Sequence, residues 1–260
     1  MSMDEPVRLR IESGVAYLTL NRPAKLNAIS IPLRDALLAA LANIRADKTI
    51  GCVVLEAEGR AFCAGQDLDE RAPILDGEDM DLGQALSDGI NRVIAELVTL
   101  PQPSIAAVQG VALGAGASLA LACDLMMMAP EAALDFGFVR LGLVPDSGAS
   151  WLLPRKIGSA RASMCLLTGA RIGSTQCLAW GLASAMAETE PELRANVEKM
   201  AANIAQLPMG ATQATKALLD YDCDHTLVAQ LQREAEAQAV RGRSLDYKQA
   251  LSRFLKRSDG

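Results

Sequence analysis

The chain predicts an α/β fold in which helices are layered on a mostly parallel sheet. Short apolar segments with strand character alternate with helical patterns over the first two-thirds of its 260 residues. From about residue 190 the pattern is helical only. Half of the residues are apolar, but aromatic residues make up only 3%, so small aliphatic side chains must fill the interior.

The first elements are a hairpin, a helix and a buried strand. Val7–Ile11 and Val15–Leu20 alternate in polarity around a Ser-Gly turn, which is typical of two paired strands. Ser30 is a suitable N-cap, and the proline at position 32 suits the first turn of a helix. Gly51–Ala57 is a short apolar run that predicts a buried strand. The helix after Ser30 has one apolar stripe, formed by Leu33, Leu37, Leu41 and Ile44.

The alternation continues beyond the first strand. We expect a mobile loop at Pro73–Gly83, because proline, aspartate and glycine are frequent there. A helix should follow over Ala85–Leu100, and the two prolines after it should end it. Further strands are expected at Ser104–Gly110 and Leu125–Ala129. In the helical end of the chain, breaks are predicted at residues 208–210 and 222–224.

Charge and hydropathy exclude several classes of protein. Lys and Arg total 25 against 31 Asp and Glu, a net charge of -6, so no basic excess exists to neutralise nucleic-acid phosphates. The chain has no apolar run long enough to cross a membrane, and its first residues lack a hydrophobic signal region. We therefore expect a soluble, cytoplasmic protein with neither a nucleic-acid nor a membrane partner.

The cysteines and the histidine do not form a pattern of metal ligands. The six cysteines are scattered among apolar residues without a C-x-x-C pair, which favours reduced thiols in the core. His225 is the single histidine. We therefore predict no metal site and no redox cofactor.

Two glycine-containing turns could hold an anionic oxygen. Residues 60–67 follow a predicted strand, and their small side chains would leave backbone N–H groups accessible. Residues 110–118 lead from a strand into a helix, whose N-terminus offers unpaired N–H donors. Gly114 and Gly116 begin a G-x-G-x-x-G pattern, but Leu119 replaces the third glycine, which argues against a dinucleotide site.

Ser118 has two interpretations. With its neighbours it approximates a nucleophile elbow, and Ser118, a later aspartate and His225 would follow the chain order of an α/β-hydrolase. A serine among alanines in a helix is also compatible with simple packing in the interior.

Asp146 also has two interpretations. It lies between Pro145 and Ser147-Gly148, after an apolar run, where an aspartate can form a turn or cap a helix. It could equally be a carboxylate beside an apolar pocket, with the raised pKa that a proton-transfer group requires. Local sequence leaves both open.

Taken together, these segments resemble the crotonase, or enoyl-CoA hydratase/isomerase, superfamily. The resemblance implies a spiral of β-β-α turns over residues 1–195, which holds an acyl-CoA thioester. It implies a helical region over residues 196–260 that forms a homotrimer or a dimer of trimers. The matching segments are Leu20–Pro23, Leu26–Ala28, Ala61–Leu68, Gly110–Ala120, Cys123-Asp124, Gly142–Gly148 and Leu153–Arg155.

The resemblance also implies roles for individual residues. The N–H groups of Gln66, after Gly65, and of Ala115, after Gly114, would hold the thioester oxygen as an enolate develops. The carbonyl of Ala64 would contact the CoA adenine. Binding of the nucleotide is further assigned to Lys25, at the phosphates, and to Phe254 and Lys256. An ordinary amphipathic helix explains the last two equally well.

The departures from the family concern its carboxylates. Family hydratases have glutamates where this chain has Ser118 and Phe138, so we expect ordinary hydration of a double bond to be poor. Asp146 matches the catalytic aspartate of a subgroup that rearranges epoxyphenylacetyl-CoA to oxepin-CoA in phenylacetate breakdown, although Ala149 replaces a glycine of that subgroup. We therefore expect an acyl-CoA isomerase in which Asp146 transfers a proton. Alternatives are a hydratase for an unusual acyl group, a CoA-ester binder without activity, and a serine hydrolase.

Overall fold

The computed structural model describes residues 5–219, 226–243 and 245–258. Most strands lie in the first two-thirds of the chain, and helices make up its C-terminal part. The strands are β1 (Val7–Glu12), β2 (Val15–Leu20), β3 (Cys52–Ala57), β4 (Ala61–Cys63), β5 (Ser104–Val108), β6 (Val111–Leu113), β7 (Leu125–Met128), β8 (Ala133–Asp135), β9 (Arg171–Gly173) and β10 (Ala185–Met186). The α-helices are α1 (Ile31–Ala46), α2 (Leu82–Ser87), α3 (Ile90–Val98), α4 (Ala115–Ala122), α5 (Ala149–Ile157), α6 (Ser159–Thr168), α7 (Ser174–Ala179), α8 (Glu190–Ala205), α9 (Met209–Leu219), α10 (Leu227–Arg241) and α11 (Leu245–Ser258), and the 3₁₀ helices are η1 (Pro23–Lys25), η2 (Leu68–Asp76) and η3 (Gly137–Leu141).

The strands form two sheets that the chain enters in turn. One sheet has the order β1-β2-β3-β5-β7-β10, and the other has the order β4-β6-β8-β9. β3, β5 and β7 lie in the first sheet, and each is followed by a short strand in the second. Apart from the hairpin β1-β2 and the pair β8-β9, the pairings are parallel. This repeat, with helices between successive turns, is the expected spiral of β-β-α units.

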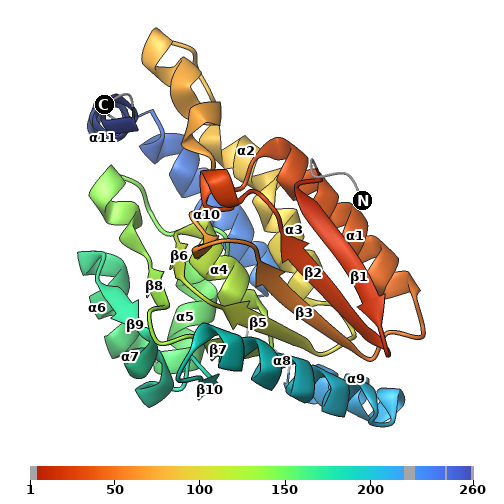
Figure 1. The fold of residues 1–260 in the computed structure, drawn as a ribbon. Helices are drawn as coiled ribbons and strands as arrows, with labels where there is room; N and C mark the ends of the chain where they lie inside the picture. The colour runs from red at the N-terminus through yellow and green to blue at the C-terminus, as the bar shows by residue number, and fades with distance from the viewer. Residues whose placement is uncertain (1–4, 220–225, 244, 259–260) are drawn as a thin grey trace.

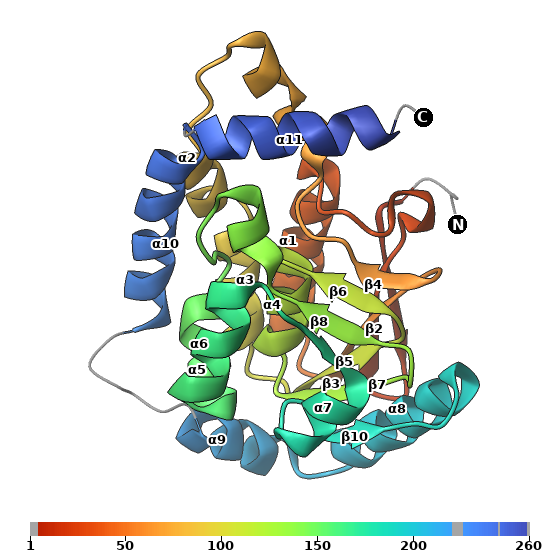
Figure 2. The ribbon, with the colours of Figure 1, turned by 90° about the vertical axis from the view of Figure 1, so that its left-hand side faces the viewer.

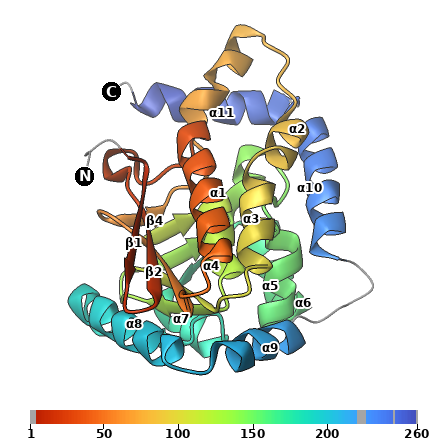
Figure 3. The same ribbon diagram turned by 90° about the vertical axis from the view of Figure 1, so that its right-hand side faces the viewer.

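Helices surround the two sheets (Figure 1). α8 packs against β2, β3, β5 and β7, whereas α4 packs against β5, β4 and β6. Figure 2 shows β4, β6 and β8 beside each other, with α10 along one side and α11 across the top. In the opposite view α1 and α3 lie next to each other in front of the sheets, as their contacts also show (Figure 3).

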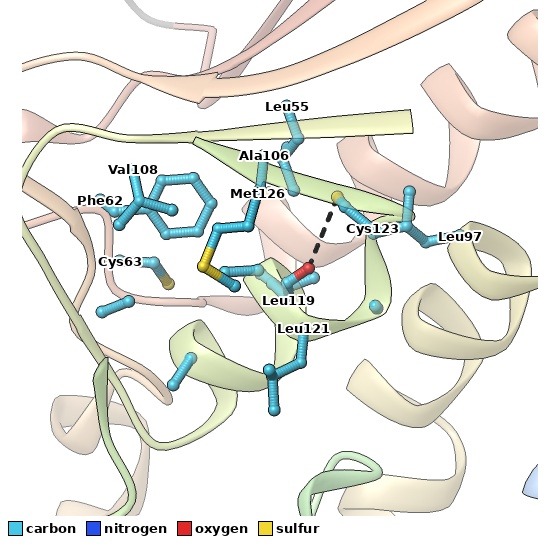
Figure 4. Close-up of a cluster of buried hydrophobic side chains, with 14 of the residues drawn as sticks. Leu55, Phe62, Cys63, Leu97, Ala106, Val108, Leu119, Leu121, Cys123 and Met126 are labelled. Atoms are coloured by element: carbon cyan, nitrogen blue, oxygen red, sulfur yellow. Dashed lines mark hydrogen bonds between the residues drawn. The ribbon is translucent and has the colours of Figure 1, made fainter. Parts of the chain in front are cut away.

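The core is built around α4, whose eight residues are all buried. Figure 4 shows Leu119 of this helix next to Met126 of β7, with Phe62 and Cys63 of β4 on the other side of the methionine and Leu121 pointing away from it. Alanine and glycine occupy much of α4, so the helix fits closely between its neighbours. The low aromatic content of the chain is consistent with this close packing.

Two buried amide side chains hold the connection between the sheets at residues 57–61. Asn27 Nδ2 donates to the carbonyls of Glu58 (2.8 Å) and Ala61 (2.9 Å), and its Oδ1 accepts from the N–H of Arg22 at 2.8 Å. Gln109 Nε2 donates to carbonyls of the same connection at 3.0–3.1 Å. Asn27 also has a positive φ of 56°, which asparagine tolerates better than most residues.

The early elements confirm the sequence predictions. The hairpin turns at Ser13 and Gly14, both with positive φ, as a two-residue turn between twisted strands requires. Ser30 caps α1 and accepts a hydrogen bond from the N–H of Leu33. The strands predicted near residues 51, 104 and 125 are β3, β5 and β7.

The segment between residues 68 and 100 differs from its prediction. Pro73–Gly83, expected to be a mobile loop, contains the end of η2 and the start of α2, and Ile74 and Leu82 there are buried. The helix expected over Ala85–Leu100 is two helices, because the chain leaves helical geometry at Gly89 (φ -112°, ψ -114°). A Cβ on that glycine would lie 2.5 Å from the carbonyl oxygen of Ala85, so the break depends on glycine.

The C-terminal part is helical, as expected. The break predicted at residues 208–210 corresponds to the boundary between α8 and α9, since residue 208 is not helical and α9 begins at Met209. The break predicted at residues 222–224 lies outside the described residues. α8 extends across residue 195, where a boundary between core and C-terminal region is expected. Within the described residues, no helix is long and apolar enough to cross a membrane.

Replacing Asn27 should destabilise the fold. Asn27→Ala removes three hydrogen bonds and leaves the Glu58 carbonyl without this donor and the Arg22 N–H without this acceptor, so we expect the free energy of unfolding to fall by about 2–4 kcal/mol. Urea denaturation measures the change. Asn43→Ala, on the exposed face of α1, is the matched control and should alter stability by less than about 0.5 kcal/mol. Equal effects of the two substitutions would contradict the role given to Asn27.

Candidate active site

The two predicted anion-binding turns lie against each other. One follows β4 at Ala64–Gln66, and the other joins β6 to α4 at Gly114. Gly65 has a φ of +84°, and a Cβ on it would lie 2.8 Å from the carbonyl oxygen of Leu113. A Cβ on Gly116 would lie 2.2 Å from the carbonyl oxygen of Cys63. The two backbones can approach this closely only because neither glycine carries a side chain.

Because of this contact, the turn that carries the N–H group of Gln66 lies next to the turn that carries the N–H group of Ala115. Gln66 pairs with Ile29 in an isolated bridge whose hydrogen bonds run from Ile29 to Gly65 (2.7 Å) and from Asp67 to Ile29 (3.0 Å), so the N–H of Gln66 is not used by the bridge. Ala115 is the first residue of α4, and its N–H has no carbonyl one turn earlier in that helix. Two such donors on adjacent turns can stabilise a negative oxygen.

Asp146 lies in the segment between η3 and α5, where it is only 4% exposed. Its Oδ1 accepts a hydrogen bond from Ser147 Oγ at 2.8 Å, and its Oδ2 accepts one from Gln238 Nε2 at 2.8 Å. Burial raises the pKa of the Asp146 carboxyl, while these two hydrogen bonds and the positive charge of Arg71 act in the opposite direction. A carboxyl with a pKa raised by burial is a better proton acceptor than an ordinary aspartate and is suited to proton transfer.

Ser118 connects Asp146 to the second turn. Its Oγ lies 3.4 Å from the carbonyl oxygen of Asp146 and 3.3 Å from that of Gly114, and it donates to both. Phe138 lies beside Gly114 in the second turn: a Cβ built on Gly114 would be 3.5 Å from the phenylalanine ring. The two positions at which glutamates were expected in hydratases therefore hold a bonded hydroxyl and an aromatic ring beside Gly114.

The alternative of a serine nucleophile receives no support from this geometry. Ser118 is fully buried, and its hydroxyl donates to two backbone carbonyls. Its proposed partner His225 lies outside the described residues. The packed serine is the interpretation that these contacts favour. Among the described residues, no group of three or more His, Cys, Asp or Glu could hold a metal ion.

Lys25 and Ala64 lie on adjoining segments. The N–H of Ala64 donates to the carbonyl of Leu26 at 2.9 Å, which places η1 against the first turn. The Lys25 ammonium is exposed and pairs with Asp69 at 2.7 Å. This hydrogen bond with Asp69 raises the pKa of Lys25, so the lysine is a cation wherever it binds.

Phe254 and Lys256 are both exposed on α11. The helix itself is held over η2 by Tyr247 and Leu251, which are buried together with Ile74 and Leu82. No contact found among the described residues connects Phe254 or Lys256 to Ala64 or Lys25, so their role at the nucleotide stays a prediction.

A cavity of about 230 Å³ lies beside Gln66. It is enclosed by the start of α1, by η2 and by the helices around Gly89. Its walls are apolar at Ile29, Ile31, Met80 and Ile90, and basic at Arg34 and Arg71. The cavity is therefore next to one of the two amide donors.

Three residues near Asp146 were missed by the sequence analysis: Gln238 from α10, Tyr247 from α11 and Arg71 from η2. Burial raises the pKa of the Tyr247 hydroxyl, and the negative charge of Asp146 adds to this rise. A single sequence carries no local signal that would bring these three positions to residue 146, because they come from distant helices.

Two backbone amides on adjacent turns and a buried carboxyl are groups that an enzyme site for stabilising an enolate and moving its proton would need. The chain belongs to the enoyl-CoA hydratase/isomerase family, whose model matches residues 10–259. It is therefore an enzyme of the crotonase superfamily. Over 253 residues it is 38% identical to 1,2-epoxyphenylacetyl-CoA isomerase from Escherichia coli K12, with 97% of this chain and 96% of that protein covered.

Further relatives include hydratases. The chain is 36% identical to a probable enoyl-CoA hydratase from Rhodobacter capsulatus over 96% of this chain and 95% of the relative. The crystal structure of an enoyl-CoA hydratase from Mycobacterium avium subsp. paratuberculosis K-10 superposes with a TM-score of 0.85 at 31% identity, covering 97% of this chain and 96% of that one. Fold and sequence thus agree on the family.

Removing the buried charge should alter how stability depends on pH. Because the folded state raises the pKa of Asp146, folding favours its protonated form, and the free energy of unfolding falls as pH rises from the ordinary value of 3.8 through the raised one. Asp146→Asn lacks this titration. We expect the variant to gain stability relative to the wild type between pH 4 and pH 8, as measured by denaturant unfolding. Asp76→Asn, at an exposed position, should give no such trend.

Proposed function

We propose that this enzyme is an acyl-CoA isomerase in which Asp146 transfers a proton while the N–H groups of Gln66 and Ala115 hold the thioester oxygen. The carboxylate takes a proton from a carbon next to the conjugated system, and the electrons of that C–H bond move onto the thioester oxygen. Return of the proton to a different carbon restores the carbonyl and shifts the double bond. The reaction has no net oxidation, so we propose no metal or redox cofactor.

The burial of the Asp146 carboxyl, in a residue whose backbone carbonyl contacts Ser118 of the helix that begins at Ala115, is the observation that carries this proposal. Preorganised donors help most where an enolate develops, and a single donor lowers the barrier by about 2.7–4 kcal/mol. Addition of water needs groups that both activate the water and protonate carbon, and the glutamates that do so in hydratases are absent at Ser118 and Phe138.

The cavity beside Gln66 is the proposed position of the acyl group. Glu70 and Arg71 of η2 and Met80, just before α2, line one of its walls, so the segment that contains them would cover the substrate. The similarity to the Escherichia coli isomerase makes an epoxidised aryl acetyl-CoA one candidate, for which the same groups would assist rearrangement to the oxepin. A simple enoyl-CoA with a movable double bond is the other.

The expected assembly and nucleotide contacts are part of the same proposal. Ala64 and Lys25 lie on adjoining segments, as a site for adenine and phosphates would require. Lys25 must exchange Asp69 for phosphate when CoA binds. Phe254 and Lys256 would complete the nucleotide site, and the C-terminal helices would form a homotrimer or a dimer of trimers.

Turnover in heavy water tests the reaction type. A panel of unsaturated acyl-CoA esters, together with epoxyphenylacetyl-CoA, is incubated with the wild type and with Asp146→Asn, and the products are analysed by mass spectrometry and NMR. We expect isomeric products that have not gained water. They differ from the substrate only in the position of a double bond or in the exchange of hydrogen for deuterium. The variant should lose at least about 100-fold in kcat, the typical contribution of a general acid–base group.

The relatives named as hydratases make hydration the competing result. A product heavier by one water would show a hydratase that uses Asp146 as its single acid–base group. Full activity of Asp146→Asn would exclude Asp146 from either reaction. Binding of the ester without deuterium exchange would indicate a protein that binds CoA esters without turning them over.

A further inference from the structure

α10 is fixed against α2 by close contact of the two backbones. A Cβ on Gly83 would lie 2.0 Å from the carbonyl oxygen of Ala235, so the helices meet without a side chain between them. Asn91 Nδ2 donates to the carbonyl of Leu231 at 3.3 Å, one turn earlier in α10. These contacts determine where the next turn of α10, which carries Gln238, lies relative to the core.

Gln238 extends from this turn to the segment that contains Asp146. Its side chain is buried, with 2% of the residue exposed. Nε2 donates to Oδ2 of Asp146 at 2.8 Å, and Oε1 lies 3.4 Å from the N–H of Val144, from which it accepts. Because each end of the amide has a different partner, only one orientation of the amide satisfies both.

We propose that Gln238 is a positioning residue, which holds the Asp146 carboxyl in one orientation and favours its ionised form before the substrate binds. This inference rests on the proposed role of Asp146 in proton transfer. Gln238 acts through Asp146, from which it is separated by 92 positions in the chain. Through this contact α10, a helix of the C-terminal region, becomes part of the proposed active site.

The physical reason is the direction of the hydrogen bond. An amide N–H donates a stronger hydrogen bond to a carboxylate than to a neutral carboxyl, so the contact stabilises the charged state. Burial acts against that state, which leaves Gln238 and Ser147 to offset part of the effect. Once Asp146 has accepted a proton from substrate, the same amide favours its return to carbon.

Other charged or titratable groups around the carboxyl come from two elements. Arg71 of η2 lowers the pKa of Asp146 by its charge, and the Tyr247 hydroxyl of α11 interacts electrostatically with Asp146. Neither belongs to α10, so both remain when Gln238 is replaced. A change in the titration of Asp146 on replacing Gln238 therefore reports on the amide contact.

Gln238→Met tests the inference, because methionine has a similar length and no amide. We expect the pKa of Asp146, followed by ¹³C NMR of its carboxyl in the substrate-free enzyme and assigned with Asp146→Asn, to rise by about one unit. The acid limb of the pH profile of kcat/KM should move upward with it. On that limb kcat/KM should fall about 10-fold at a given pH, the fold-change of one pKa unit, with KM within about threefold of the wild type, since the amide supports the base rather than binding.

Gln102→Met is the matched control. Gln102 is also buried, at 1% exposure, and its Nε2 donates to the carbonyl of Ile44 at 2.8 Å, away from Asp146. Both replacements remove a buried amide, so both should lower the unfolding temperature. Only Gln238→Met should move the pH profile. If both variants lose activity without any shift in pH dependence, Gln238 has a structural role alone and the inference is wrong.

Gln238→Glu provides a second, isosteric variant. It retains an acceptor for the N–H of Val144 but places a second carboxyl against Asp146, so the two should share one proton and the acid limb should move further than in Gln238→Met. An unchanged pKa of Asp146 in both variants would overturn the positioning role even if the enzyme is an isomerase. Full turnover by Asp146→Asn would instead overturn the proposed function.

Discussion

The active site depends on the close approach of two backbone turns that meet without side chains. Gly65 lies against Leu113, and Gly116 lies against Cys63, at separations that leave no room for a methyl group. This contact joins the end of β4 to the start of α4 and so ties two strands of the second sheet, β4 and β6, to one helix N-terminus. The small residues of α4, the position of Phe138 and the donors at Gln66 and Ala115 all follow from it. A larger residue at either glycine would separate the amides before it affected any reacting group.

A second constraint is the burial of a single carboxyl among apolar groups. Asp146 is removed from water, which disfavours its charge, yet Ser147 and Gln238 both donate to its oxygens. The effect of burial is the larger, so the pKa of the carboxyl is raised, while the two donors hold its oxygens in place. The helices that supply Gln238 and Tyr247 belong to the C-terminal part of the chain. The chemistry of the site is therefore shared between the spiral and the region after it.

The parts that the sequence predicted are those with local signals. The hairpin at Ser13-Gly14, the cap at Ser30 and the strand-to-helix turn at Gly114 each follow from residues close in the chain. The second sheet could not be predicted, because its strands have only three residues each and no periodicity to detect. The loop expected at residues 73–83 is shorter than predicted, covering residues 77–81, because Ile74 and Leu82 on its two sides are buried with residues of α11, a contact that composition does not reveal. Gln238 was missed for the same reason.

The burial of Ser118 limits how this site could change during evolution. Its hydroxyl occupies a space bounded by the backbone carbonyls of Gly114 and Asp146, so a longer, charged glutamate side chain there would be forced against two carbonyl oxygens in the dry interior. Introducing the hydratase residue at position 118 by itself should therefore displace the segment that carries Asp146. A change from one carboxylate arrangement to the other would need compensating substitutions around this segment.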